Sequence, residues 1–170
     1  MKKSKFFGVA AVVATLVSAF LLAGCVSMPE LSSSTKYDEI IEVPDISADD
    51  LFTKVNLWMV DQFNNADSVI QYSDKAAGVL KGKYSFSGDP IMGGLGGRLV
   101  YFSTLTIEVK SGKCRVSFAD PVYDSYDGKG QKYASGAYLR TQSQVDEVIA
   151  RWQELVGSLK QNLLSKGADW

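Results

Sequence analysis

The sequence has 170 residues, 46% of them hydrophobic and 22% charged, which suits one globular domain with its own core. Three of the 18 lysine and arginine residues lie among the first five positions, so the chain after residue 24 carries 15 cations against 19 acids, a net charge of −4. This balance argues against nucleic acid as a partner. Histidine is absent, which excludes His-based serine and cysteine triads and His-ligated metal sites.

Residues 1–24 have the form of a lipoprotein signal peptide. Basic residues precede an uncharged apolar run from Phe6 to Leu22, and the run ends in Leu22-Ala23-Gly24-Cys25. This ending resembles the bacterial lipobox, in which the cysteine thiol receives a diacylglyceryl group and the chain is cleaved just before it. We therefore expect cleavage between Gly24 and Cys25, and acyl chains on Cys25 that anchor the protein stably to a membrane.

The anchor predicts a location at the cell membrane or outer membrane, on the exported side, and the covalent lipid is the only cofactor that we expect. Two alternatives stay open. The run from Phe6 to Gly24 just reaches the length of a membrane-spanning helix, and a signal peptide can also be cleaved without lipid transfer.

The second cysteine, Cys114, has no partner for a disulfide if Cys25 carries lipid. It lies in the alternating segment "KCRVSF", where a cysteine typically behaves as a small buried hydrophobic residue. A catalytic role would require a group that activates the thiol, and the sequence has no histidine to do so.

Residues 25–36 combine the lipidated cysteine with a segment that contains a proline, three consecutive serines and no periodicity, and we interpret them as a flexible tether. The folded domain is expected to span residues 37–168. It begins with a strand at 37–43, and Ser47 with Asp50 then starts a helix whose apolar residues recur at helical spacing to about Phe63. Strand patterns follow at 68–73, 78–86, 97–110 and 113–118.

A final helix is predicted to begin near Ser143, with an apolar stripe that runs to Leu163 and a stop at Gly167. Short connections make the last four strands an antiparallel meander, with Ser111-Gly112 as a tight turn. Both helices must bury their stripes on one face of the sheet. The prediction is a two-layer α+β domain in the order β-α-β-β-β-β-α.

The segments "ISADDLFTKVNLWMVDQFNNADSVIQYSDKAAGVLKGKYSF" (46–86) and "TLTIEVKSGKCRVSF" (104–118) resemble a bacterial family known as domain of unknown function 4468. That family is described as having a fold like that of the TATA-binding protein (TBP). The resemblance implies the same element order, and many members are exported or lipid-anchored. It implies no activity and no catalytic residues, and the fold name gives no reason to expect DNA binding.

Strand alternation divides the sheet residues into two faces. The apolar face, expected to contact the helices, comprises Ile70, Tyr72, Leu80, Tyr84, Leu105, Ile107, Val109, Cys114, Val116 and Phe118. The opposite face is polar and is either simply solvated or a binding surface. Its candidate binding residues are Lys81, Lys83, Phe102 and Arg115.

Two predicted loops contain residues that are typical of ligand-binding sites. The glycine-rich segment 87–99 lacks the Lys-Ser/Thr pair and the following helix of a phosphate-binding loop, so we interpret it as a hairpin connection. Residues 119–138 are interpreted as a long loop, in which Tyr123, Tyr126 and Tyr133 form a candidate patch for a glycan or protein. Aspartates of this loop match no calcium motif, so no metal site is predicted.

These observations predict a lipoprotein whose domain is a non-catalytic binding or scaffolding module at the membrane, with an envelope protein or glycan as its partner. The alternative is an envelope hydrolase that uses carboxylates of the 119–138 loop. A hydrolase of this kind needs a concave pocket that holds two carboxylates, whereas a binding module needs an open face or patch.

Overall fold

The computed structural model describes residues 30–63, 69–88 and 96–165. Within these ranges the elements are, in chain order, β1 (Tyr37–Glu42), α2 (Ala48–Gln62), β2 (Ile70–Asp74), β3 (Val79–Ser87), β4 (Arg98–Lys110), β5 (Lys113–Tyr126), β6 (Lys132–Tyr138) and α4 (Gln142–Leu164). The predicted signal peptide, Cys25 and the stop at Gly167 lie outside the described residues.

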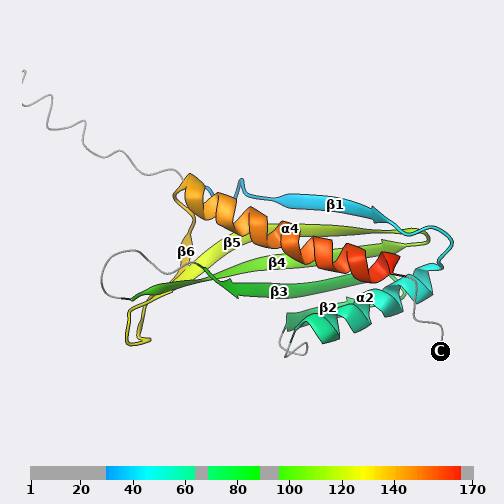
Figure 1. Cartoon of the computed structure of the whole chain (residues 1–170), viewed down its shortest axis with the longest axis horizontal. Helices are drawn as coiled ribbons and strands as arrows, with labels where there is room; N and C mark the ends of the chain where they lie inside the picture. Colours follow the sequence, from blue (N-terminus) through cyan, green and yellow to red (C-terminus); the bar gives the residue numbers. More distant parts are fainter. Residues whose placement is uncertain (1–29, 64–68, 89–95, 166–170) are drawn as a thin grey trace, which may run out of the picture.

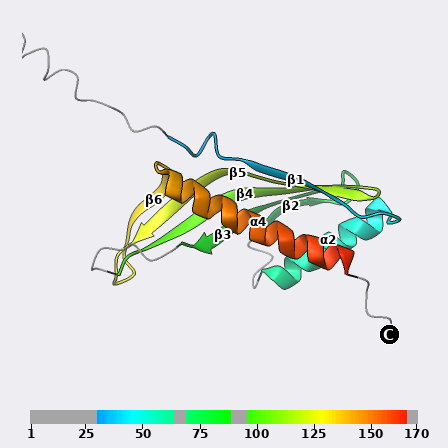
Figure 2. The ribbon, with the colours of Figure 1, turned by 45° about the horizontal axis from the view of Figure 1, so that its top comes forward.

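The strands form one antiparallel sheet in the order β1-β5-β4-β3-β2, and β6 also pairs with β5. Long β5 thus pairs with two short strands, β1 along its first half and β6 along its second. Helices α2 and α4 cover one face of this sheet, as Figures 1 and 2 show from two angles. The predicted two-layer α+β architecture is confirmed.

The structure adds a sixth strand that the sequence interpretation treated as loop. Strand β5 continues past Phe118 to Tyr126, and β6 returns beside it. A bulge accommodates Asp120 and Pro121 opposite Ser103, with Asp120 at φ 52°. Because proline has no N–H to donate, it is tolerated at a bulge, so it does not end the strand here.

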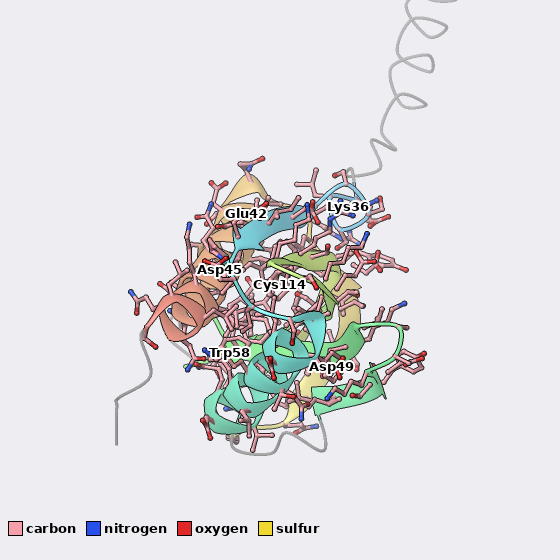
Figure 3. All side chains as sticks on the ribbon, turned by 90° about the vertical axis from the view of Figure 1, so that its right-hand side faces the viewer. Lys36, Glu42, Asp45, Asp49, Trp58 and Cys114 are labelled. Atoms are coloured by element: carbon pink, nitrogen blue, oxygen red, sulfur yellow. The ribbon has the colours of Figure 1, made fainter. Side chains whose placement is uncertain are left out.

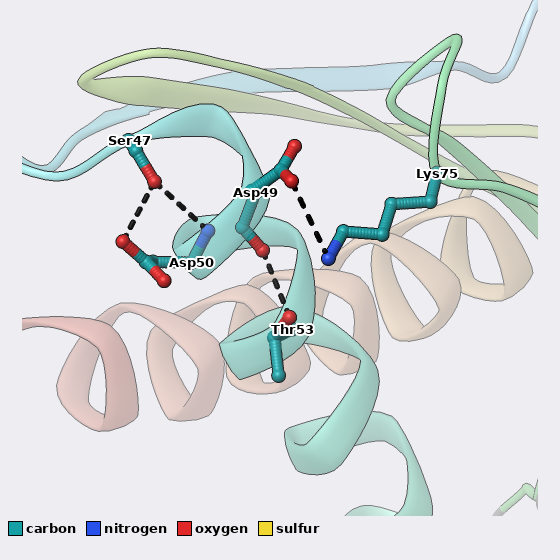
Figure 4. A network of polar contacts seen from close by, with 5 residues as sticks. All are labelled: Ser47, Asp49, Asp50, Thr53 and Lys75. Atoms are coloured by element: carbon teal, nitrogen blue, oxygen red, sulfur yellow. Dashed lines mark hydrogen bonds and ion pairs between the residues drawn. The ribbon is translucent and has the colours of Figure 1, made fainter.

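Helix α2 begins where its predicted capping residue, Ser47, places it. The backbone N–H of Asp50 donates to Ser47 Oγ at 3.1 Å, and Lys75 forms an ion pair with Asp49 at 3.6 Å in the first turn of α2 (Figure 4). Helix α4 begins one residue earlier than predicted, after Thr141, whose side chain forms a capping box with Gln144.

The core lies between the helices and the sheet. Figure 3 views the molecule from the end that holds the β4–β5 turn and shows Cys114 and Trp58 in this layer. Trp152 of α4 is fully buried, stacks on Phe118 of β5 with ring centroids 5.1 Å apart, and donates from Nε1 to Ser103 Oγ at 3.1 Å. This pair fixes α4 across the middle of the sheet.

One residue of the predicted apolar face is on the other side. Tyr72 is 50% exposed, because a bulge at Gln71 places Ile70 opposite Gly82 but Tyr72 opposite Lys81. A one-residue slip exchanges the two faces of a strand. The other residues predicted for this face are buried or partly buried, as expected.

The described part of the predicted tether is bound to the fold. The Leu31 N–H donates to the Leu139 carbonyl at 2.9 Å, and the Leu139 N–H donates to Ser32 Oγ at 2.7 Å. Ser32 and Thr35 are buried. We call residues 31–35 with Leu139 the N-terminal clip. The segment is polar in sequence, yet it is ordered because partners far along the chain satisfy its hydrogen bonds.

Candidate functional site

The face of the sheet opposite the helices, here called the open face, carries polar side chains from five strands. No helix of the described residues covers it (Figure 3). Antiparallel pairing aligns its side chains in rows across the strands. One row consists of Asp38, Ser117, Thr106 and Lys81, and the next of Ile40, Arg115, Glu108 and Val79.

Arg115 belongs to an ion-pair cluster near the β4–β5 turn. Its guanidinium lies 3.8 Å from Asp38 and 3.6 Å from Glu108, and Ser117 Oγ donates to Asp38 at 2.6 Å. These side chains are about half exposed, so solvent screens the pairs and each adds little stability. The cluster borders a shallow pocket of about 190 Å³ lined by Ile40, Glu108, Lys110, Lys113, Cys114 and Arg115.

A second pocket lies further along the open face, beside the β5 bulge. The Lys83 ammonium sits 4.4 Å from the centroid of the Phe102 ring, in cation–π geometry. Asp120 enters from the bulge of β5. We call this the Lys83 pocket; its volume is about 170 Å³ and its lining is Gln71, Lys83, Phe102, Ser103, Thr104, Asp120 and Val122.

The structure brings together only part of the predicted binding face. Lys83 and Phe102 are in contact. Lys81 lies two residues before Lys83 on β3, and its side chain is on the same face. Neither lysine forms an ion pair with a carboxylate of the described residues. Arg115 instead lies in the separate cluster, where two carboxylates hold it.

Among the residues of the Lys83 pocket, Lys83 and Phe102 were predicted as binding residues, whereas Gln71, Ser103, Thr104, Asp120 and Val122 were not. Asp120 lies at the bulge of β5, which shifts side chains out of simple alternation. The Asp120-Pro121 pair is the signal that could have indicated this bulge. Together the pocket offers a cation, an aromatic ring, an amide and a carboxylate, a set that suits a polar ligand with hydrogen-bonding groups.

The predicted tyrosine patch is not one surface. Tyr123 packs edge-on against buried Tyr101 with centroids 6.0 Å apart, so it belongs to the core side. Tyr126 lies between Arg98 and Lys132, at 4.9 Å and 5.5 Å from its ring centroid. Tyr133 is 64% exposed on β6.

The aspartates of residues 119–138 do not gather. Asp124 is buried and accepts hydrogen bonds from Lys132 Nζ at 2.7 Å, the Gly136 N–H at 2.9 Å and Ser135 Oγ at 3.0 Å. Asp127 accepts from two backbone amides of the β5–β6 turn. Among the described residues no group of carboxylates or thiols could hold a metal ion.

Burial alone raises the pKa of a carboxyl group, but the hydrogen bonds from Lys132, Gly136 and Ser135 outweigh it and hold the pKa of Asp124 below its ordinary value. We predict that Asp124→Asn lowers the free energy of unfolding by about 1 to 2 kcal/mol at neutral pH. Because the folded-state pKa is lowered, the carboxylate stabilises the fold above its unfolded pKa, and this stabilisation disappears as the pH falls through the folded value.

Urea unfolding followed by circular dichroism from pH 7 down to pH 3 measures this effect. The difference in the free energy of unfolding between wild type and Asp124→Asn should stay constant above about pH 5 and become smaller below about pH 4. Lys132→Gln removes the strongest partner but keeps the carboxylate, so the folded-state pKa of Asp124 should lie closer to its unfolded value and this group should contribute a smaller acid-dependent loss of stability than in the wild type. A difference that does not change with pH would contradict the assignment.

Cys114 is the one cysteine within the described ranges, and it has no disulfide partner there. It is 1% exposed, and burial raises the pKa of its thiol to about 11. A thiol in this state is protonated and shielded, which matches its prediction as a small core residue.

Known proteins were compared with the chain. No curated protein matches it significantly. A crystal structure of a DUF4468 family protein from Bacteroides ovatus ATCC 8483 is similar, with a TM-score of 0.57 and 15% identity over 86% of this chain and 95% of that one. A TBP-like protein from Parabacteroides distasonis ATCC 8503 has a TM-score of 0.56 and 13% identity over 75% and 91%.

These two similarities concern the fold alone, because the identities are low. The family profile described as a domain of unknown function (DUF4468) with TBP-like fold matches residues 37–124, which run from the start of β1 into the second half of β5. The match covers more than half of the sequence and includes both bulges of the open face. The chain therefore belongs to the DUF4468 family.

Proposed function

We propose that the protein is a lipid-anchored lipoprotein of the bacterial cell envelope whose DUF4468 domain is a non-catalytic binding module. The sequence Leu22-Ala23-Gly24-Cys25 at the end of an apolar run supports the anchor. Within the described ranges no helix has the length and hydropathy to cross a bilayer. The lipid on Cys25 holds the domain at the cell membrane or outer membrane, on the exported side.

The Lys83 pocket is the observation that carries the binding role. It lies on a sheet face without a helix, and it combines Lys83, which is unpaired among the described carboxylates, with the Phe102 ring and Asp120. The exposed Lys83 ammonium, positioned beside an aromatic ring, can contact an anionic or hydroxyl group of a ligand. An envelope protein or glycan supplies such groups.

Hydrolysis by the 119–138 carboxylates has less support. Asp124 is neutralised by Lys132, and Asp127 holds the β5–β6 turn together. The Lys83 pocket and the pocket beside the Arg115 cluster are each lined by one carboxylate residue, Asp120 and Glu108 respectively. General acid and base chemistry on a glycosidic bond needs two carboxylates across one substrate. The observations therefore favour binding.

The anchor predicts a specific outcome for Cys25→Ala. This variant should leave the membrane fraction and appear in the soluble fraction, because position 25 no longer has a thiol to accept lipid. The wild-type protein should stay with the membrane and show acyl mass on Cys25 by mass spectrometry of its mature N-terminus. Cys114→Ala is the matched control and should not change the fractionation. A wild-type protein found mostly in the soluble fraction would refute the anchor.

The binding face predicts the result of site-specific crosslinking in intact cells. A photoreactive phenylalanine analogue at Phe102 should capture an envelope protein or glycan, whereas the same analogue at Val60, which is 50% exposed on α2, should not. Adding Lys83→Ala should weaken capture about tenfold, the effect of losing roughly 1.4 kcal/mol of binding. Equal capture at both positions, or capture insensitive to Lys83→Ala, would contradict this face as the site.

A further inference from the structure

The N-terminal clip determines where the anchored end of the chain leaves the domain. Leu31 and Ser32 are hydrogen-bonded to Leu139, between β6 and α4, and Thr35 donates its side-chain hydroxyl to the Leu31 carbonyl at 2.7 Å. The chain upstream of Leu31 therefore starts from the β6 end of the molecule. Figure 1 shows β6, the beginning of α4 and the beginning of β4 at this end, with the β4–β5 turn at the opposite end.

The clip also shortens the link to the lipid. The sequence interpretation counted residues up to Lys36 as tether, but the chain is held from Leu31 onward. Between Cys25 and Leu31 a fully extended chain reaches at most about 20 Å. The β6 end of an anchored domain must therefore stay within about that distance of the lipid headgroups.

The side chains at the β6 end suit a lipid surface. Lysine, arginine and tyrosine are the residues that typically contact anionic headgroups and the interfacial zone. Tyr133 and Tyr138 of β6 are more than half exposed. The cations here are all exposed, and we call them with these tyrosines the basic end: Arg98, Lys129, Lys132 and Arg140.

The carboxylates near the basic end have partners inside the domain. Asp124 is buried against Lys132, and Asp127 accepts the amides of Lys129 and Gln131. Asp146 in α4 accepts from the Gln142 side chain at 2.8 Å. Arg98, Lys129 and Arg140 form no ion pair with a carboxylate of the described residues, so their charges are available to lipid phosphates.

We propose that the basic end docks on the anionic phospholipid surface, so that the domain stands on the membrane end-on. This inference rests on the lipid anchor proposed above. Strand β4 is about 40 Å long at the rise of an antiparallel strand, and it runs from the basic end to the β4–β5 turn. The Arg115 cluster and the turn at Ser111 are then held away from the bilayer. The open face is roughly perpendicular to the membrane surface.

Energy transfer from two positions measures this orientation. The lipidated full-length protein is reconstituted into vesicles of phosphatidylethanolamine and phosphatidylglycerol that carry an acceptor on the headgroup. A donor is attached to Tyr133→Cys or, as the matched control, to Ser111→Cys. Lipid occupies the Cys25 thiol and Cys114 is buried, so the introduced thiol is the one that reacts. Transfer should be several-fold more efficient from position 133 than from position 111.

Charge dependence separates docking from simple tethering. On neutral phosphatidylcholine vesicles, or with Lys129→Gln and Arg140→Gln together, the difference between the two positions should shrink, because the tether alone permits tilting. Lys54→Gln and Lys113→Gln together remove equal charge elsewhere and should keep the difference. Equal transfer from both positions on anionic vesicles, or a difference that ignores lipid charge, would overturn the proposal.

Failure of the anchor is distinguishable from failure of the docking. If the protein carries no lipid on Cys25 and does not float with vesicles, the proposed anchor fails. The mature chain, coupled through Cys25 to a maleimide-bearing lipid and carrying the donor on a noncanonical amino acid at position 133 or 111 in place of the introduced cysteine, then tests the orientation independently. Unequal transfer from this coupled chain on anionic vesicles supports docking, and equal transfer overturns it.

Discussion

Replacing Trp152 with alanine is expected to lower the free energy of unfolding by about 3 to 5 kcal/mol. The indole is fully buried and stacks on Phe118 at an interplanar angle of 12°. Its removal leaves a large cavity between α4 and the sheet, and it also deprives Ser103 Oγ, which is 3% exposed, of its donor. Urea unfolding followed by circular dichroism measures the loss.

Trp152→Phe separates the contribution of ring packing from that of the hydrogen bond to Ser103. The phenyl ring preserves most of the stack on Phe118 but cannot donate to Ser103, so its cost should be smaller, about 1 to 3 kcal/mol. The double variant Trp152→Phe with Ser103→Ala removes the unpaired hydroxyl and should recover part of that cost. An alanine variant within about 1 kcal/mol of the wild type would show that α4 is not held by this contact.

Replacing Gly78 with alanine is the second substitution with a large expected effect, a loss of at least about 2 kcal/mol. Gly78 lies in the β2–β3 turn at φ +67°, a backbone conformation that L-residues adopt only with strain. An added Cβ would also lie 2.4 Å from the carbonyl oxygen of Val109, whose N–H donates to the Gly78 carbonyl at 2.7 Å. The methyl group must therefore push the turn away from β4.

Gly130→Ala is the matched control. Gly130 has φ +81° in the β5–β6 turn, but an added Cβ there would meet nothing within 4 Å. It should cost only the conformational strain, about 1 to 2 kcal/mol. Thermal and urea unfolding of both variants gives the comparison. If Gly130→Ala proved as costly as Gly78→Ala, the close approach of the turn to β4 would not matter for stability.

Apolar periodicity and capping residues predicted both helices, strands β1 to β4 and the first half of β5. The apolar stripe from Val145 to Leu163 and the cap at Ser47 are local signals. In the structure the stripe is buried and Ser47 caps α2, as predicted. Strand β6 was not predicted because its stability comes from pairing with β5 rather than from its own composition. Gly130 and Gly136 lie in or near it, and such residues locally indicate a turn.

The candidate site was predictable only in part for a related reason. Lys83 and Phe102 follow from simple alternation, and they do meet. Asp120 joins them only because the bulge in β5 changes the direction of its side chain. The burial of Ser32 was also not predictable, since its partner Leu139 lies 107 residues away and a serine carries no hydrophobic signal.

The N-terminal clip has a kinetic consequence. Contacts between residues distant in sequence close slowly, because the chain loses loop entropy before it gains stabilisation. Strand β1 pairs with β5, and the N-terminal clip requires Leu139. When the chain emerges amino end first, each of these contacts can form only after its later partner has emerged. Until β5 has emerged, β1 has no partner strand and can pair wrongly. The N-terminal segment of this domain is therefore expected to reach its final position late in folding, after most of the chain has emerged.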